Sequence, residues 1–132
     1  MLEAYSTAVS VVEGQDIIFQ TVKENNNVVS GSSGNASLYL NATGNYIVAF
    51  NLTATPAEAG TVAVQMFING SADVRTSVSQ TVAADETANV SFVVPVTHRS
   101  CCCRNNGTAL TFRYTGTAGI ANLTHVTIWR VA

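Results

Sequence analysis

The sequence predicts an all-β sandwich of roughly eight to ten short strands, and two observations carry that prediction. The first is composition: the 132 residues include 16 Thr and 18 Val, whose branched side chains fit a pleated strand better than a helix. The second is spacing, because apolar residues recur at every second position, and no segment shows the helical repeat of about 3.6 residues. We therefore expect one domain over residues 1–132, without a linker or an internal repeat.

Stretches of alternating apolar residues, each ended by turn residues, are the predicted strands. In chain order they are Ser6–Val12, Asp16–Val22, Asn35–Leu40, Tyr46–Thr55, Val62–Ile68, Val74–Val82, Val90–Val96, Leu110–Thr115 and Leu123–Val131. The alternation is clearest where Tyr46, Val48 and Phe50 share one face. The segments between the strands are rich in Gly, Asn, Ser and Asp, as at Asn69-Gly70, and these residues favour turns.

Two of these strands carry further positional information. Pro95 lies inside Val90–Val96, and proline cannot donate to a strand ladder, so we expect an edge strand or a bulge there. Leu123–Val131 has apolar residues on both faces, which predicts a strand covered on both sides.

Charge and hydropathy exclude several classes of function. The net charge is −2, and six scattered Lys and Arg residues make no basic patch, so we expect no nucleic-acid partner and no polybasic membrane contact. No apolar run approaches the roughly 20 residues of a membrane span, so we expect no membrane insertion. The first residues, Met1–Ser6, lack the pattern of a secretory signal, and we expect assembly in the cytoplasm.

Four stretches resemble the C1q/TNF-like jelly-roll superfamily. They are Gly44–Leu52, Val62–Gly70 with its closing Asn-Gly, Val90–Val96 with the Cys-rich segment and Asn105–Thr108 after it, and Ala121–Ala132. More closely, the chain is similar to small bacterial and phage relatives of the C-terminal head of the spore-surface glycoprotein BclA. The resemblance covers about Ala4–Ala132 and implies a jelly roll of about ten strands that forms a homotrimer. The chain lacks the Gly-x-y repeats of a collagen-like stalk.

The resemblance also implies which surface forms the trimer, because in such trimers the sheet that carries both termini lines the three-fold axis. Here that sheet would contain Ser6–Val12, Tyr46–Thr55, Leu110–Tyr114 and Leu123–Val131. The expected interface residues are Tyr46, Phe112, Tyr114, His125 and Trp129.

The residues themselves also point to an apolar interface. Alternation puts Trp129 and Ile128 on opposite faces, and we expect Trp129 at the interface and Ile128 in the core. Phe19, Ile47 and Phe67 likewise fall opposite the best core stripes, and exposed apolar surface of this kind marks an interface.

Cys101, Cys102 and Cys103 form the most unusual local feature, with His98 three residues before them. Adjacent side chains in an extended chain point to opposite faces, so three consecutive cysteines are poorly placed to share one zinc ion. A metal at a three-fold axis, with one ligand from each subunit, is a minor alternative. The main alternatives are disulfides between subunits in an oxidising exterior and reduced thiols that behave as small apolar residues.

No catalytic motif is present, and His98 and His125 lie far apart, so we expect no enzyme activity and no cofactor. The leading interpretation is a structural and adhesive protein on a particle surface, such as the trimeric head of a bacteriophage fibre, a capsid decoration or a receptor-binding tip. Its partners would be further copies of itself, other particle-surface structural proteins and a host-cell receptor or glycan. The alternatives are a bacterial spore-surface (exosporium) protein and a soluble lectin-like module. The loops Asn25–Gly34, Pro56–Gly60 and His98–Gly107 are the expected contact surfaces.

Overall fold

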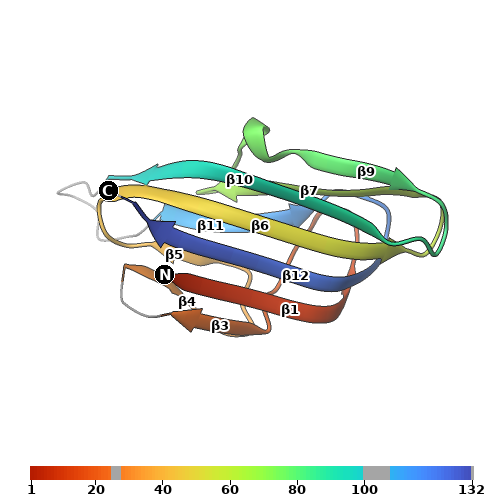
Figure 1. The fold of residues 1–132 in the computed structure, drawn as a ribbon, viewed down its shortest axis with the longest axis horizontal. Coiled ribbons are helices and arrows are strands. Elements are labelled where there is room, and N and C mark those ends of the chain that lie inside the picture. Colours follow the sequence, from red (N-terminus) through yellow and green to blue (C-terminus); the bar gives the residue numbers. More distant parts are fainter. Residues whose placement is uncertain (25–27, 100–107, 132) are drawn as a thin grey trace.

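The computed structural model describes residues 1–24, 28–99 and 108–131, and it confirms the all-β prediction. Two sheets pack face to face as a sandwich (Figure 1). The strands are β1 (Leu2–Val11), β2 (Gln15–Asp16), β3 (Thr21–Glu24), β4 (Val29–Gly31), β5 (Leu38–Leu40), β6 (Gly44–Pro56), β7 (Gly60–Ile68), β8 (Ser71–Ala72), β9 (Val78–Val82), β10 (Ala88–His98), β11 (Thr108–Tyr114) and β12 (Gly119–Arg130). A 3-10 turn, η1, covers Val74–Thr76. Within the described ranges, no helix has the length and hydropathy needed to cross a membrane.

The first sheet has five strands in the order β10-β6-β12-β1-β3, and both ends of the chain lie at one end of it (Figure 1). All its neighbours are antiparallel; β12 is central and pairs Ile128 with Val48 on β6 and with Leu2 on β1. Strand β10 is at the edge of the sheet, which confirms the position predicted from Pro95.

The second sheet has seven strands, in the order β4-β5-β11-β7-β8, with β2 beside β11 and β9 beside β7. The expectation that Leu110–Tyr114 joins the sheet with both termini is wrong, because β11 pairs with β2, β5 and β7 in this second sheet. The physical reason lies in the short connection from β11 to β12, which crosses the sandwich instead of forming a hairpin. Gly116 and Gly119 permit that crossing, since a Cβ on either residue would meet a backbone oxygen at 2.2 or 2.3 Å.

Most predicted strand ends shift by a few residues in the structure, and three of the differences change how the chain is placed in the sandwich. The first strand begins at Leu2 instead of Ser6, because its opening residues pair with β12. The predicted strand Asp16–Val22 is divided between the sheets: β2 belongs to the second and β3 to the first. The chain crosses the core between them, so Phe19 is fully buried and its expected outward position is wrong. The predicted strand Val74–Val82 opens instead with the 3-10 turn η1.

Aromatic rings from both sheets fill the centre of the sandwich. Phe112 on β11 stacks on Phe50 on β6, with ring centroids 4.8 Å apart and an interplanar angle of 9°. Phe19 meets the same Phe112 ring edge-on at 5.7 Å, and Phe92 stacks on Phe50 at 5.2 Å. Aromatic pairs prefer these offset and edge-to-face arrangements, so the cluster holds the two sheets in one relative position.

The 3-10 turn is held by an ion pair at its start. Asp73 caps the turn: its carboxylate accepts a hydrogen bond from the Arg75 backbone N–H at 3.0 Å and contacts the Arg75 guanidinium at 2.8 Å. These hydrogen bonds, of which the side-chain bond is the stronger influence, lower the pKa of Asp73 from its ordinary value. The Arg75 guanidinium also donates to the Pro95 carbonyl at 3.1 Å, so the ion pair ties the turn to the edge strand β10.

The Asp73→Asn variant should lose about 0.5–1 kcal/mol of folding stability at pH 7, because the amide keeps the cap but not the charge. The folded-state pKa of Asp73 lies below that of the unfolded chain. The pair's stabilisation is therefore complete above about pH 4 and is lost as the pH falls through the lower, folded value. Urea unfolding at pH 7 and pH 3 should show the difference from the wild type shrinking at the lower pH. The exposed Glu86→Gln change is the control, and an equal Asp73→Asn deficit at both pH values would contradict this account.

Candidate functional site: the outer face of the first sheet

The surface of the five-stranded sheet that points away from the second sheet is the candidate interaction site, and we call it the outer face. Alternation along each strand sends one set of side chains into the core and leaves the other set on this surface. Its members on the four longest strands include Glu3, Tyr5, Thr7, Asn45, Ile47, Ala49, Asn51, Thr53, Thr55, Asn89, Ser91, Val93, Pro95, Thr97, Leu123, His125, Thr127 and Trp129.

An apolar row crosses the outer face near the chain termini, and beyond it, at the very end, Thr97 Oγ1 donates to Asn45 Oδ1 at 2.8 Å. Strand register places Pro95 beside Ile47, and Ile47 beside Trp129, so three apolar side chains form a row across β10, β6 and β12. In the next row Val93 is 67% exposed beside Ala49. Water therefore contacts a continuous apolar strip on a sheet surface with few charges, and such strips mark protein contact sites.

On strand β12, the side chains of one face are buried in the core and those of the other face are partly exposed to solvent. Its core-facing residues Val126 and Ile128 are fully buried, whereas Leu123 on the outer face is 40% exposed and Trp129 is half-buried. The sequence predicted that this strand is covered on both sides. Within the single chain, only its core side is covered. The opposite orientations of Trp129 and Ile128 agree with the prediction from alternation.

A contact between a histidine and a carboxylate occupies the middle of the outer face. His125 Nε2 lies 3.0 Å from Glu3 Oε1, and both side chains are partly exposed. The Lys23 ammonium lies 5.8 Å from the centroid of the Tyr5 ring, next to the same pair. Polar groups of this kind fix the orientation of a partner more than they add affinity.

The other end of the outer face carries amides and hydroxyls that bond to one another. Asn89 Nδ2 donates to Asn51 Oδ1 at 2.8 Å and to Thr53 Oγ1 at 2.9 Å. Asn122, at the bulge in β12, donates to Thr55 Oγ1 at 2.8 Å. These side chains already satisfy each other, as Thr97 and Asn45 do at the opposite end, so the outer face carries an apolar row near the termini and a self-bonded polar end away from them.

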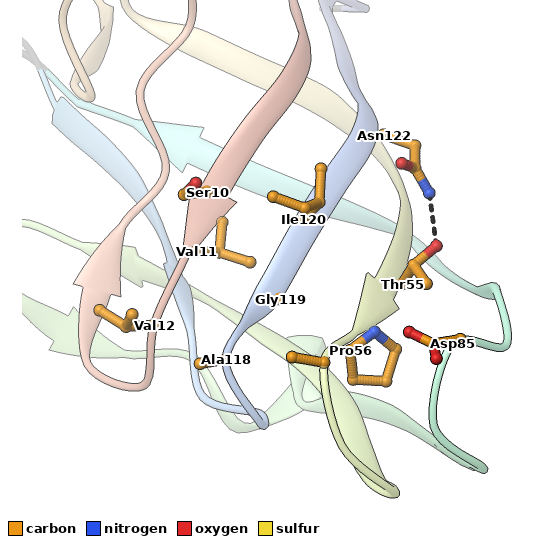
Figure 2. Close-up of a pocket in the computed structure, with 11 residues that line it drawn as sticks. Ser10, Val11, Val12, Thr55, Pro56, Asp85, Ala118, Gly119, Ile120 and Asn122 are labelled. Carbon is orange, nitrogen blue, oxygen red and sulfur yellow. Dashed lines mark hydrogen bonds between the residues drawn. The ribbon is translucent and has the colours of Figure 1, made fainter.

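A pocket of about 610 Å³ lies beyond the polar end (Figure 2). Its walls are mostly apolar, with Val12 51% exposed and Ile120 42% exposed, and Asp85 stands at one side. Thr55 and Asn122, joined by their hydrogen bond in Figure 2, line both the pocket and the outer face. The sequence did not predict this pocket, because its walls come from the ends of β1, β6 and β12, distant along the chain but neighbours in the first sheet, and from the loops beside them.

Three of the five predicted interface residues are in the core. Tyr46, Phe112 and Tyr114 have no exposed surface in the single chain, so no neighbouring copy can reach them, and the prediction is wrong for these three. Tyr46 donates its hydroxyl hydrogen to the Ala42 carbonyl at 2.5 Å, and Tyr114 donates to the Thr117 carbonyl at 2.6 Å. Burial raises the pKa of both phenols. His125 and Trp129 do lie on the outer face.

The predicted cysteine site lies outside the described residues, since these do not include Cys101, Cys102 or Cys103. His98, just before them, is buried, and its Nδ1 lies 2.6 Å from Thr108 Oγ1. In residues 1–24, 28–99 and 108–131, no three His, Cys, Asp or Glu side chains come close enough together to hold a metal ion.

Comparison with solved structures shows the fold of the chain. It matches the globular domain of the zebrafish complement 1qA protein with a TM-score of 0.67 and 12% sequence identity, over 99% of this chain and 96% of that one. It matches the Eiger TNF of S. frugiperda with a TM-score of 0.65 and 11% identity, over 98% of this chain and 92% of that one. No protein-family model matches the chain, and no curated protein matches it in sequence. The two sheets and the strand order are therefore those of a jelly roll like the C1q and TNF domains.

Proposed function

We propose that this chain, with the jelly-roll fold of C1q and TNF domains, is a non-catalytic structural and adhesive module that assembles as a homotrimer through its outer face. The apolar row of Pro95, Ile47 and Trp129 carries the proposal. Three apolar side chains on adjacent strands, beside the exposed Val93, leave an uncovered surface near the end of the first sheet where both termini lie. A second and a third copy of the same chain would remove that surface from water.

Trp129 is the side chain expected to contribute most to such an interface. Tryptophan is enriched at the few interface positions whose truncation costs 2 kcal/mol or more in binding, about the largest effects that alanine scanning finds. A closed trimer contains three copies of the same interface. A substitution at Trp129 therefore weakens all three contacts at once. The ring is already half-buried in the single chain, beside its register partner Ile47, so assembly would have less side-chain freedom to remove than at a fully exposed position.

The Trp129→Ala variant should fold but fail to assemble. Light scattering at micromolar concentration should give the wild type about three times the 13.9 kDa chain mass, and the variant the mass of one chain. The matched control is Phe67→Ala, because Phe67 is a half-buried aromatic residue on the second sheet, and that variant should remain trimeric. Circular dichroism should show the same strand signal in all three proteins.

Two results would contradict the trimer proposal. A wild-type protein that scatters as a single chain at these concentrations would remove its basis. A Trp129→Ala protein that stays trimeric while its subunits become several kcal/mol less stable would assign the ring to the subunit core instead.

The second part of the proposal concerns the kind of particle that carries this module. We favour a virion surface, as a bacteriophage fibre head, a capsid decoration or a receptor-binding tip. The support is a chain with 11% charged residues and a surface of Thr and Asn, which suits a stable and inert particle component. The resemblance to the BclA head supports a spore surface as the second candidate. Mass spectrometry of purified virions and of purified spores tests the choice, because the chain should be abundant in only one of them.

A further inference from the structure

A small recess on the second sheet lies on the opposite side of the sandwich from the proposed trimer interface. It has a volume of about 300 Å³ and is lined by Ser32, Asn35, Ala36, Ser37 and Tyr39. Strand β5 supplies its aromatic wall: Leu38 and Leu40 point into the core and are fully buried, and Tyr39 between them is 40% exposed. The recess would stay open to solvent in a trimer formed through the outer face.

The polar side chains of the recess are not engaged elsewhere in the described structure. There, Ser32, Asn35 and Ser37 make no side-chain hydrogen bond. Serines just outside the recess differ, since Ser33 Oγ accepts from the Val22 N–H at 3.0 Å, and Ser30 Oγ accepts from Asn41 at 2.8 Å. The recess thus holds three polar side chains whose donors and acceptors are available to a ligand.

The backbone around the recess is anchored to the core. Phe19 is fully buried, and its N–H donates to the Asn35 carbonyl at 3.1 Å, while its carbonyl accepts from the Gly34 N–H at 2.7 Å. The Asn35 N–H also donates to the Ser32 carbonyl at 3.1 Å. These bonds hold the Ser32–Asn35 turn against the sandwich, so the backbone that carries the unpaired groups is in place before any ligand arrives.

The chemistry of this lining selects one class of ligand. No charged side chain lines the recess, so a phosphate or carboxylate would find no counter-charge. A neutral pyranose ring fits, because its C–H face can pack on an aromatic ring while its hydroxyls exchange hydrogen bonds with hydroxyl and amide groups. The volume is at the low end for small-molecule sites, which suits a single sugar ring.

We propose that this recess is a carbohydrate-binding site, in which Tyr39 stacks on one neutral sugar residue of a glycan and Asn35, Ser32 and Ser37 bond its hydroxyls. The site gives the adhesive module a contact surface of its own, and it does not require the trimer. A shallow site of this size should bind one sugar with a dissociation constant of about 1 mM or weaker.

Saturation-transfer NMR on the full chain tests the proposal, with the methyl glycosides of glucose, galactose, mannose and N-acetylglucosamine as probes. At least one glycoside should receive signal from the protein. Tyr39→Ala and Asn35→Ala should each reduce that signal by about tenfold, as expected for losing one stacking or amide contact. Tyr39→Phe should retain it, since the ring remains.

The matched control is Phe67→Ala, on the same sheet surface, where the Arg113 guanidinium already covers the ring at 4.2 Å from its centroid. That variant should bind as the wild type does. Absence of transfer to all four glycosides would overturn the proposal, and so would transfer that survives both Tyr39→Ala and Asn35→Ala. The glycoside signal reports on the second sheet, whereas the mass from light scattering reports on assembly through the outer face. A negative glycoside result therefore does not change the test of the trimer proposal.

Discussion

Replacing Phe112 with alanine should lower the free energy of unfolding by about 3–5 kcal/mol, among the largest effects of any substitution in this chain. The ring has no exposed surface and contacts three other rings: Phe50 at 4.8 Å, Phe19 at 5.7 Å and Phe92 at 6.2 Å between centroids. Phe112 lies on the second sheet, Phe50 and Phe92 lie on the first sheet, and Phe19 lies on the segment that crosses between them. The variant therefore leaves a cavity at the point where the two sheets meet, and the sandwich can close it only partly.

Urea unfolding at a fixed protein concentration measures the effect, since the apparent stability of an oligomer depends on concentration. Phe67→Ala is the control, because the same side chain is removed from the half-exposed surface of the second sheet. It should cost about 1 kcal/mol, chiefly from the lost contact with Arg113. Equal losses for the two variants would show that the Phe112 ring is not the centre of the core.

Gly116→Ala should cost about 3 kcal/mol, through a clash instead of a cavity. Thr115 and Thr117 on either side donate to the carbonyls of Ala63 and Thr61 at 2.9 and 2.7 Å, which draws Gly116 against β7. A Cβ there would lie 2.2 Å from the Thr61 oxygen and 2.7 Å from the Ala63 nitrogen. Both are backbone atoms, so no side-chain rotation relieves the overlap, and the crossing from β11 to β12 must shift.

Gly70→Ala is the matched control for this clash. Gly70 has φ +84 and nothing within 4 Å of an added Cβ, so that change should cost only about 1 kcal/mol, from the left-handed backbone. Thermal and urea unfolding of the two variants should place Gly116→Ala clearly below Gly70→Ala in stability. The reverse order would mean that the crossing is looser than the contacts around Gly116 indicate.

The alternation of apolar and polar residues was sufficient to predict most of the strands and the orientation of some side chains. Alternation has a period of two within one strand, so it predicted that Trp129 and Ile128 point to opposite sides, and the structure agrees. Pro95 predicted an edge strand for the same local reason, because its missing N–H cannot serve a second neighbour. For the candidate site, this local information was enough to place Trp129 and His125 on a strand surface.

Local pattern could not tell which of the two sheets a strand joins. Tyr46, Phe112 and Tyr114 alternate as regularly as Trp129 does, but which side of a strand faces the core depends on the partner sheet. Strand β11 pairs within the second sheet, Gly116 lets the chain cross from it to β12, and the face of β11 that carries Phe112 and Tyr114 packs against the first sheet.

The sequence by itself determined the all-β class, most of the strands, the edge position of β10 and the outward orientation of Trp129. Only the tertiary structure decided that Tyr46, Phe112 and Tyr114 belong to the core, and that the pocket at Ile120 and the recess at Tyr39 exist. The physical reason is that the strand pattern depends on neighbours along the chain, whereas burial depends on residues that two packed sheets bring together from distant parts of it. The two concave sites depend on how strand ends and turns lie in the folded sandwich.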